Sequence, residues 1–523
     1  MIEGIFTLFS YILRRIGMMF LILFGSSYLS YVLMAYSSDP LAAFGESTEK
    51  NKAFLIKQTI IQLQLDVPPP VRFFLWLRGV VSGLWGQLDL GVTRFGKQPV
   101  LEVMGAAIPV TFRLVIASTI LAIFIGIIVG LLTAIRQYSR FDYSMTFVSF
   151  LLFSVPVFWF AVMLKIYLAV QFNDFLVDPT IPWYAIVITG LLVGFAISEM
   201  SGLTKLRYFV LLGVSAGIIS GLLFLASASK WFINPTLGIV GVAALALSSG
   251  LVITQLSTGL RNRQSLIASM STAAFVIACY YPFQALLAPS SNILAVVLMF
   301  VITIGAAILI GYSVQKIDRR INIRTAILTA IFATLPVVFD RFMQEFQGYY
   351  QSEAIHGRPI PTLGQSNDYL SEEQLNSFWI SGLDAIMHLI LPTIALTLIS
   401  FAGYVRYSRA SLLEVMNMDY IRTARAKGLN ERTVIMRHAL RNSMLPLTTI
   451  LVNDFAGVIG GAIITETVFQ WKGMGKIFKT ALDTFDLNLF MGVFVLGAAL
   501  TILANLVADL LFGVVDPRIR VRK

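Results

Sequence analysis

Residues 16–36 read IGMMFLILFGSSYLSYVLMAY and follow Arg14 and Arg15. About twenty apolar residues cross the hydrocarbon core of a bilayer, so this uncharged run is long enough for a transmembrane helix. It is too long for the core of a signal peptide and has no convincing cleavage site. We therefore expect an uncleaved anchor whose N-terminus lies on the cytoplasmic side.

Similar apolar runs fill most of the chain. The protein has 523 residues, of which 57% are hydrophobic and 13% are charged, whereas a soluble globular domain carries roughly 25% charged residues. The alternating segments of an outer-membrane barrel are absent, which leaves the helical class of membrane protein. The composition therefore predicts an all-α polytopic membrane protein and nearly excludes a soluble enzyme.

The apolar pattern predicts twelve spans with both termini in the cytoplasm. After the first, they lie near residues 111–135, 143–171, 183–203, 208–228, 236–257, 265–288, 292–315, 323–343, 385–405, 445–466 and 489–513. The short outer loops 172–182 and 289–291 contain no Lys or Arg, whereas every short inner loop contains at least two. This asymmetry follows the positive-inside rule. The net charge of +11 therefore reflects topology and contact with membrane lipid, not binding of nucleic acid.

Three longer polar segments remain between the spans. We expect residues 37–108 and 344–384 to lie on the outer side of the membrane and residues 406–444 to lie on its cytoplasmic side. The stretch VRFFLWLRGVVSGLW at residues 71–85 fits an amphipathic helix on the membrane interface, or a small packed helix of the outer segment. These polar segments are where partner proteins can dock.

Residues 419–446 of the inner segment read DYIRTARAKGLNERTVIMRHALRNSMLP. Gly428 interrupts a basic, helix-forming stretch, so we expect two short helices around a turn. Ile421 and Ala424 lie three positions apart on one helix face, which makes a small apolar ridge flanked by cations. Such a ridge suits close approach to another protein, while adsorption of a basic helix on anionic lipid is the alternative.

The string YIRTARAKGL at residues 420–429 resembles the cytosolic coupling loop of ABC-importer permeases, in the form found in the dipeptide, oligopeptide and nickel permease family. Relative to the general E-A-A-x-x-x-G pattern, Arg422 and Thr423 replace the first two residues, and Ala424 and Gly428 match. The resemblance implies that this loop contacts ATPase subunits, with Ala424 and Gly428 intolerant of bulk. The implied coupling residues are Tyr420, Ile421, Arg422, Thr423, Ala424, Arg425, Gly428 and Leu429.

A second segment resembles the family's G-x-x-x-x-E-x-x-F-x-x-x-G-x-G stretch, which implies a loop at the outer mouth. Its residues are Gly461, Glu466, Phe469, Gly473 and Gly475, with Lys472 where the family usually has proline. The resemblance implies a type I importer core of six helices, into which about six further spans are inserted. We therefore divide the chain into an N-terminal core, residues 1–171, an inserted region, residues 172–355, and a C-terminal core, residues 356–523.

The resemblance implies a permease subunit that forms half of a translocation pathway in a bacterial cytoplasmic membrane. The implied partners are a second homologous permease, two ABC subunits that bind ATP and Mg, and an extracellular or periplasmic substrate-binding protein. The implied cargo is a dipeptide or oligopeptide, with nickel chelates and other small solutes as alternatives.

No G-x-x-x-x-G-K-[ST] phosphate loop occurs in the chain, so we expect no ATP hydrolysis and no cofactor here. Cys279 is the only cysteine and the three histidines are scattered, which argues against a metal site.

Two residues of the spans are candidates for the pathway. Pro156 is a candidate kink, although prolines are ordinary in membrane helices. Asp454 lies about 12 Å into its span by helical rise, where an ionised group needs a partner or water.

Residues 208–229, 231–260 and 264–315 contain no charged side chain, so we expect the inserted region to be a peripheral annex and not a second transport route. A secondary transporter or an intramembrane enzyme would need charged midspan sites or a catalytic motif, and the sequence shows neither.

Overall fold

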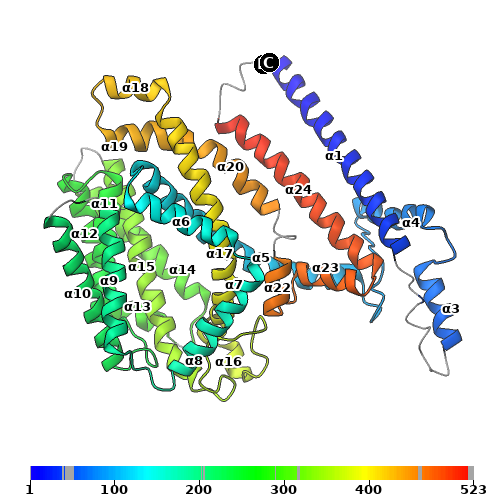
Figure 1. The fold of residues 1–523 in the computed structure, drawn as a ribbon, viewed down its shortest axis with the longest axis horizontal. Helices are drawn as coiled ribbons and strands as arrows, with labels where there is room; N and C mark the ends of the chain where they lie inside the picture. Colours follow the sequence, from blue (N-terminus) through cyan, green and yellow to red (C-terminus); the bar gives the residue numbers. More distant parts are fainter. Residues whose placement is uncertain are drawn as a thin grey trace. The chain divides into compact units, whose positions relative to one another are not determined.

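The computed structural model describes residues 2–37, 41, 52–201, 203, 206–288, 290–314, 319–456 and 462–515. Over these residues the chain consists of helices and their connections, with an isolated bridge between Val92 and Pro99 (Figure 1). The all-α polytopic fold predicted from the sequence is therefore confirmed. The chain divides into two compact units, of which the first comprises residues 1–164, 363–365 and 391–523 and the second residues 165–362 and 366–390.

The first unit contains the helices nearest the two ends of the chain. Those before the second unit are α1 (Ile2–Ser37), α3 (Lys52–Leu63), α4 (Pro69–Ser82), the 3-10 turn η1 (Gly83–Trp85), α5 (Val100–Ile135), α6 (Arg140–Ser154) and α7 (Val157–Met163). Those after it are the C-terminal part of α17 (Phe378–Met416), α18 (Asp419–Ala426), α19 (Glu431–Thr433), the π-helical η3 (Val434–Ala439), α20 (Leu440–Ala456), α22 (Ile463–Phe469), α23 (Met474–Asp483) and α24 (Leu487–Val515).

The second unit contains the helices between them. They are the π-helical η2 (Leu164–Val170), α8 (Gln171–Phe175), α9 (Trp183–Ser201), α10 (Leu206–Ala228), α11 (Gly238–Ser257), α12 (Arg263–Ala278), α13 (Tyr280–Leu286), α14 (Ile293–Ser313), α15 (Arg319–Tyr350), α16 (Glu372–Asn376) and the first part of α17. Apolar side chains of α11 to α15 and of α17 form one of its buried clusters, which includes Phe283, Met299 and Trp379.

Ten helices of the described residues are long and apolar enough to cross a membrane, or eleven if α12 and α13, which are bent by 55°, form one span. The remaining predicted span, at 445–466, lies partly outside the described residues. The expected span at 143–171 is broken, because Pro156 lacks an N–H and follows the extended Val155, so that a new helix begins at Val157. Of the expected span at 445–466, α20 covers the first part and α22 the end, and residues 457–461, including Gly461, lie outside the described residues.

Helices α5 and α17 cross at close range within the first unit. Gly126 and Gly130 of α5 face Tyr404 and Ser408 of α17, and a Cβ on either glycine would overlap these side chains. This spacing of small residues lets two backbones approach in lipid, where packing and hydrogen bonds hold helices together. The two long helices are therefore packed as a pair.

Helix α4 covers most of the stretch at residues 71–85. Phe73 is fully buried and contacts Tyr31 of α1 edge-on, with ring centroids 5.5 Å apart, whereas Phe74 is exposed. Edge-to-face aromatic contacts of this kind add to the stability gained by burial. One face of α4 is therefore packed, as one of the two alternatives predicted, while the other face presents Phe74 and aliphatic side chains outward.

Candidate functional site

The predicted coupling loop forms a helix, a turn and a second helix. Helix α18 ends at Ala426, and Gly428 turns the chain with a φ of +76°, a conformation that favours glycine. Asn430 caps the next helix, since its side-chain oxygen accepts the N–H of Thr433 at 3.1 Å. The prediction of a short second helix was wrong, because α19, η3 and α20 continue without a gap to Ala456. The loop is thus joined directly to a long helix.

Ile421 and Ala424 lie on the inner face of α18. Ile421 is fully buried and Ala424 is 7% exposed. Both belong to an apolar cluster with Leu412 of α17 and Val434 of η3. The predicted outward orientation of this ridge was therefore wrong, because the aliphatic side chains gain more by packing against this chain's own helices than by staying in water. The two residues attach α18 to the rest of the unit.

The outer face of α18 and the turn after it are accessible. The exposed residues of the predicted set are Tyr420, Arg422, Thr423, Arg425, Gly428 and Leu429. Tyr420 is 42% exposed and Leu429 is 40% exposed, so an aromatic and an aliphatic side chain accompany the arginines. Tyrosine and arginine are enriched in protein interfaces and at their energetic centres.

Polar contacts fix this outer face. The side-chain amide of Asn442 donates a hydrogen bond to the Tyr420 hydroxyl at 2.8 Å, which links α18 to α20. Arg425 donates two hydrogen bonds, of 2.6 and 3.2 Å, to the carboxylate of Glu431 across the turn. The hydrogen bond from Arg425 lowers the pKa of the Glu431 carboxyl. An exposed ion pair adds little stability, so the pair mainly sets the geometry of the turn.

A buried carboxylate connects α17 to α6. Asp142 is 2% exposed and accepts two hydrogen bonds from the guanidinium of Arg409, at 2.8 and 2.9 Å. It also accepts the backbone N–H of Tyr138 at 3.0 Å. Burial alone would raise the pKa of Asp142, but the hydrogen bonds from Arg409 and Tyr138 outweigh it, so the pKa is lowered. The bidentate geometry fixes the orientation of both side chains.

The predicted outer-mouth residues centre on Glu466, which is fully buried. Its carboxylate accepts the hydroxyl of Thr111 at 2.6 Å and the backbone N–H of Lys476 at 2.9 Å. The Thr111 hydroxyl oxygen in turn accepts the N–H of Met474 at 2.7 Å. The acid thus satisfies N–H groups of the first turn of α23, where negative charge is favoured. These bonds join α5, α22 and α23.

The two glycines of this segment are required by close packing. A Cβ at Gly473 would overlap the Glu466 carboxylate, and a Cβ at Gly475 would lie 2.6 Å from the Cα of Ile463. Phe469 is 2% exposed. The structure therefore brings together the four predicted residues that it describes, Glu466, Phe469, Gly473 and Gly475, as a buried packing unit and not as an open surface.

The two pathway candidates lie in different environments. Asp454 of α20 is half-buried, and its carboxylate accepts the hydroxyl of Tyr404 of α17 at 2.6 Å. Pro156 lies at the break between α6 and α7. Asp454 therefore has the partner that a carboxylate within a span needs, and Pro156 marks a place where the chain changes direction.

Sequence reasoning missed a buried carboxylate in the second unit. Asp340 of α15 is fully buried, and one of its oxygens accepts the N–H groups of Leu237 and Gly238 at 2.7 and 3.1 Å. The other oxygen accepts the hydroxyl of Tyr280 at 2.6 Å and the amide of Gln344 at 2.9 Å. The available signal was an acid within the predicted span at 323–343. Because its oxygens are saturated by hydrogen bonds, Asp340 serves to join α11, α13 and α15.

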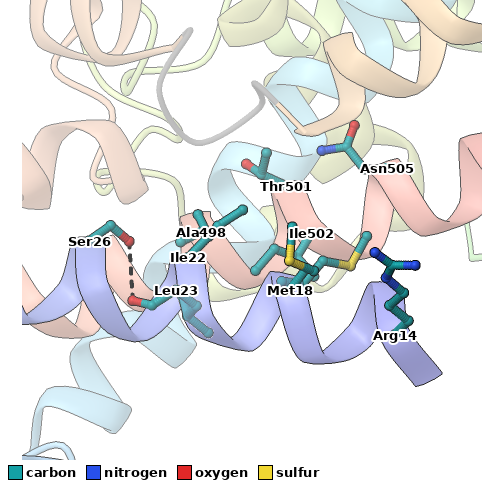
Figure 2. Close-up of a pocket in the computed structure, with 10 residues that line it drawn as sticks. Arg14, Met18, Ile22, Leu23, Ser26, Ala498, Thr501, Ile502 and Asn505 are labelled. Atoms are coloured by element: carbon teal, nitrogen blue, oxygen red, sulfur yellow. Dashed lines mark hydrogen bonds between the residues drawn. The ribbon is translucent and has the colours of Figure 1, made fainter. Parts of the chain in front are cut away.

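A cavity of about 940 Å³ lies between α1 and α24 (Figure 2). Its lining residues are Arg14, Met18, Met19, Ile22, Leu23 and Ser26 of α1 and Ala498, Thr501, Ile502 and Asn505 of α24. The lining mixes methionine and aliphatic side chains with hydroxyl and amide groups. Among the residues that the structure describes, no group of His, Cys, Asp and Glu side chains could hold a metal ion.

The chain resembles known transport proteins. Residues 122–521 match the family described as binding-protein-dependent transport system inner membrane component. The chain is 50% identical to the dipeptide transport system permease protein DppB of Escherichia coli K12 over 141 residues, which cover 27% of this chain and 42% of DppB. It is 40% identical to the oligopeptide transport system permease protein OppB of Mycobacterium tuberculosis over 138 residues, or 42% of that protein. With the oligopeptide transport system permease protein AppB of Bacillus subtilis, identity is 26% over 98% of this chain and 99% of AppB.

Proposed function

This chain belongs to the family of binding-protein-dependent transport system inner membrane components, and we propose that it is a permease subunit of an ATP-driven importer of dipeptides or oligopeptides. Its membership of a transport family and its ten apolar helices make it a multi-pass inner-membrane transport component. The names of DppB and AppB support a peptide cargo. Because the DppB alignment covers less than half of that relative, cargo and assembly remain part of the proposal.

In this proposal the chain forms half of the translocation pathway and pairs with a second homologous permease. Two ABC subunits bind ATP and Mg on the cytoplasmic side, and an extracellular or periplasmic binding protein delivers the peptide. Both termini and residues 406–444 lie in the cytoplasm, which the distribution of Lys and Arg supports. The absence of a phosphate loop from the sequence is consistent with ATP hydrolysis by partner subunits.

The attachment of α18 carries the proposal. Ile421 and Ala424 are packed against α17 and η3, while Arg422 and Thr423 face outward. When the ABC subunits close, they would push on the outer face of α18. Since close-packed interiors transmit displacement instead of absorbing it, α17 and α20 would move with α18. The crossing of α17 with α5 would carry this motion further into the membrane, as a rigid-body change between inward-facing and outward-facing states.

The predicted residues then take two roles. Tyr420, Arg422, Thr423, Arg425 and Leu429 would contact the ABC subunits, with Gly428 setting the turn. Ile421 and Ala424, on the buried face of α18, would hold that surface in position. Asp454 stays a candidate for the pathway, since it is only half-buried, and Pro156 stays a candidate for bending.

The test uses the full complex in proteoliposomes with the binding protein and peptide. Arg422→Glu should leave membrane insertion intact but lower both retention of the ABC subunits and peptide uptake about tenfold, which corresponds to about 1.4 kcal/mol of lost contact. Arg207→Glu, at an exposed arginine in the first turn of α10, is the matched control and should transport normally.

Normal uptake by Arg422→Glu, or an equal loss in Arg207→Glu, would count against α18 as the coupling surface. Purification from native membrane without any ATPase would overturn the importer proposal itself and favour a secondary transporter.

A further inference from the structure

A groove of about 300 Å³ runs along one face of α15 in the second unit. Its lining residues are Arg320, Ile323, Arg324, Ile327 and Leu328. They follow the i, i+3, i+4, i+7, i+8 spacing that places side chains on a single helix face. Arg320 and Arg324 therefore lie about 6 Å apart along the helix at the N-terminal end of the groove, with Ile323 between them, and Ile327 and Leu328 follow within about 6 Å of Arg324 toward the middle of the helix.

The arginines of this groove are accessible, and none of the acids that the structure describes pairs with them. Arg320 and Arg324 are exposed, and among the residues that the structure describes neither forms an ion pair. The neighbouring Arg319 differs, since its guanidinium lies 3.7 Å from the ring centroid of Tyr312. The guanidinium groups of Arg320 and Arg324 are therefore accessible to an external anion.

Further arginines lie at the same end of the second unit as the groove. The Ser265 hydroxyl donates to the side-chain oxygen of Asn322 at 2.9 Å, and the hydroxyls of Ser257 and Thr325 lie 2.9 Å apart. These contacts bring the end of α11 and the start of α12 beside the start of α15. Segments 258–264 and 319–324 contain two and three arginines and no acid: Arg261, Arg263, Arg319, Arg320 and Arg324.

We propose that this groove binds an acidic glycerophospholipid, with its phosphate between Arg320 and Arg324 and an acyl chain along Ile323, Ile327 and Leu328. Helix α15 qualifies as a membrane span, so its first turns lie where lipid headgroups meet hydrocarbon. Guanidinium groups bind phosphate with paired hydrogen bonds. Basic pockets between membrane helices are a recurrent means of holding acidic lipids.

A lipid fits this groove better than another membrane helix. A helix seated there would take two arginines out of water and would need to supply acids of its own. A phospholipid supplies the anion and the hydrocarbon in one molecule and at the required spacing. This inference does not depend on what the chain transports.

The test measures lipid binding by the purified full chain in mild detergent. Phosphatidylglycerol should bind to the unaltered chain, and the double variant Arg320→Gln/Arg324→Gln should bind it at least about tenfold more weakly. The matched control Arg261→Gln/Arg263→Gln removes the same number of charges at the same end of the unit, without altering the groove, and should bind normally. Phosphatidylcholine and free glycerol phosphate should each bind weakly, since one lacks net negative charge and the other lacks acyl chains.

Equal weakening in both double variants would show general attraction of acidic lipid to basic charge and would overturn a specific site. Tight binding of glycerol phosphate would replace the lipid with a soluble anion. A photoreactive residue at Leu328 in native membrane should acquire the mass of a phospholipid. Attachment to a polypeptide instead would show that another protein occupies the groove.

Discussion

Thr111 of α5 donates its hydroxyl to the carboxylate of Glu466 of α22 at 2.6 Å, across 355 positions of sequence. The same hydroxyl oxygen accepts the N–H of Met474 at 2.7 Å, so a single side chain serves two partners. Both hydroxyl and carboxylate are buried, and a buried polar group that loses its partner is costly. This arrangement makes the loop after α22 part of the packed first unit.

Replacement of Thr111 by valine should destabilise the first unit. Valine preserves the shape but leaves Glu466 with one donor fewer and the Met474 N–H without its acceptor, at a cost of about 1–3 kcal/mol. Thr111→Ser keeps the hydroxyl and is the control. Thermal unfolding in detergent measures the difference, and equal melting of the two variants would show that the hydroxyl is not needed.

Gly473→Ala should also be destabilising, for a steric reason. The added Cβ would overlap the Glu466 carboxylate, and forced overpacking costs typically about 1–3 kcal/mol. Gly105→Ala is the matched control, because nothing lies within 4 Å of a Cβ there. That substitution removes a helix-interior glycine and should be neutral or stabilising by roughly 0.5–1 kcal/mol. Equal unfolding temperatures for both variants would contradict the packing account.

The Arg409–Asp142 pair should show strong coupling in a double-mutant cycle. Arg409→Gln leaves the carboxylate, which is 2% exposed, without its cation and should cost on the order of 3 kcal/mol. Asp142→Asn added to Arg409→Gln should restore much of the loss, because the uncompensated charge is gone. If the stability losses of Arg409→Gln and Asp142→Asn simply add in the double variant, the two side chains do not form a specific pair.

The direction of the Asp142 pKa shift determines the pH range in which the Arg409–Asp142 pair contributes to stability. Since the folded-state pKa is lowered, the contribution is fully present above the ordinary aspartate value of about 3.9 and is lost as pH falls through the lowered value. The cycle measured at neutral pH therefore reports the intact pair.

Truncation of Ile421 should detach α18 from the body of the unit. Ile421→Ala removes a fully buried side chain, which costs about 2–5 kcal/mol in a packed core. Leu429→Ala, at a position that is 40% exposed, should change stability by no more than about 0.5 kcal/mol. Hydrogen exchange of the α18 amides measures the local opening directly. Unchanged protection in Ile421→Ala would show that the helix is held by other contacts.

Asp340→Asn should loosen the second unit. An amide has one oxygen where the carboxylate has two, so one set of donors, either from Leu237 and Gly238 or from Tyr280 and Gln344, would face an N–H₂ group. The expected loss is about 1–3 kcal/mol, detected as faster proteolysis of the second unit. Asp368→Asn, at an exposed position, should leave proteolysis unchanged. Equal proteolysis rates in the two variants would show that Asp340 does not hold α11, α13 and α15 together.

The sequence predicted some elements of the site better than others. The short basic helix and the turn at Gly428 were predicted correctly, because composition and a glycine are local signals. The orientation of Ile421 and Ala424 was not predicted correctly, because a three-residue spacing shows that two residues share a helix face but not what that face packs against. The pairing of Glu466 with Thr111 left no pattern in the sequence, because the partner comes from a distant helix.

Composition and the distribution of charge determined by themselves that this chain is a bundle of membrane helices, because long uncharged runs have no other stable arrangement in lipid. The tertiary structure alone decided how α18 is attached and which acids are buried. These features depend on contacts between distant segments and on the satisfaction of individual polar groups. Neither is encoded by local periodicity.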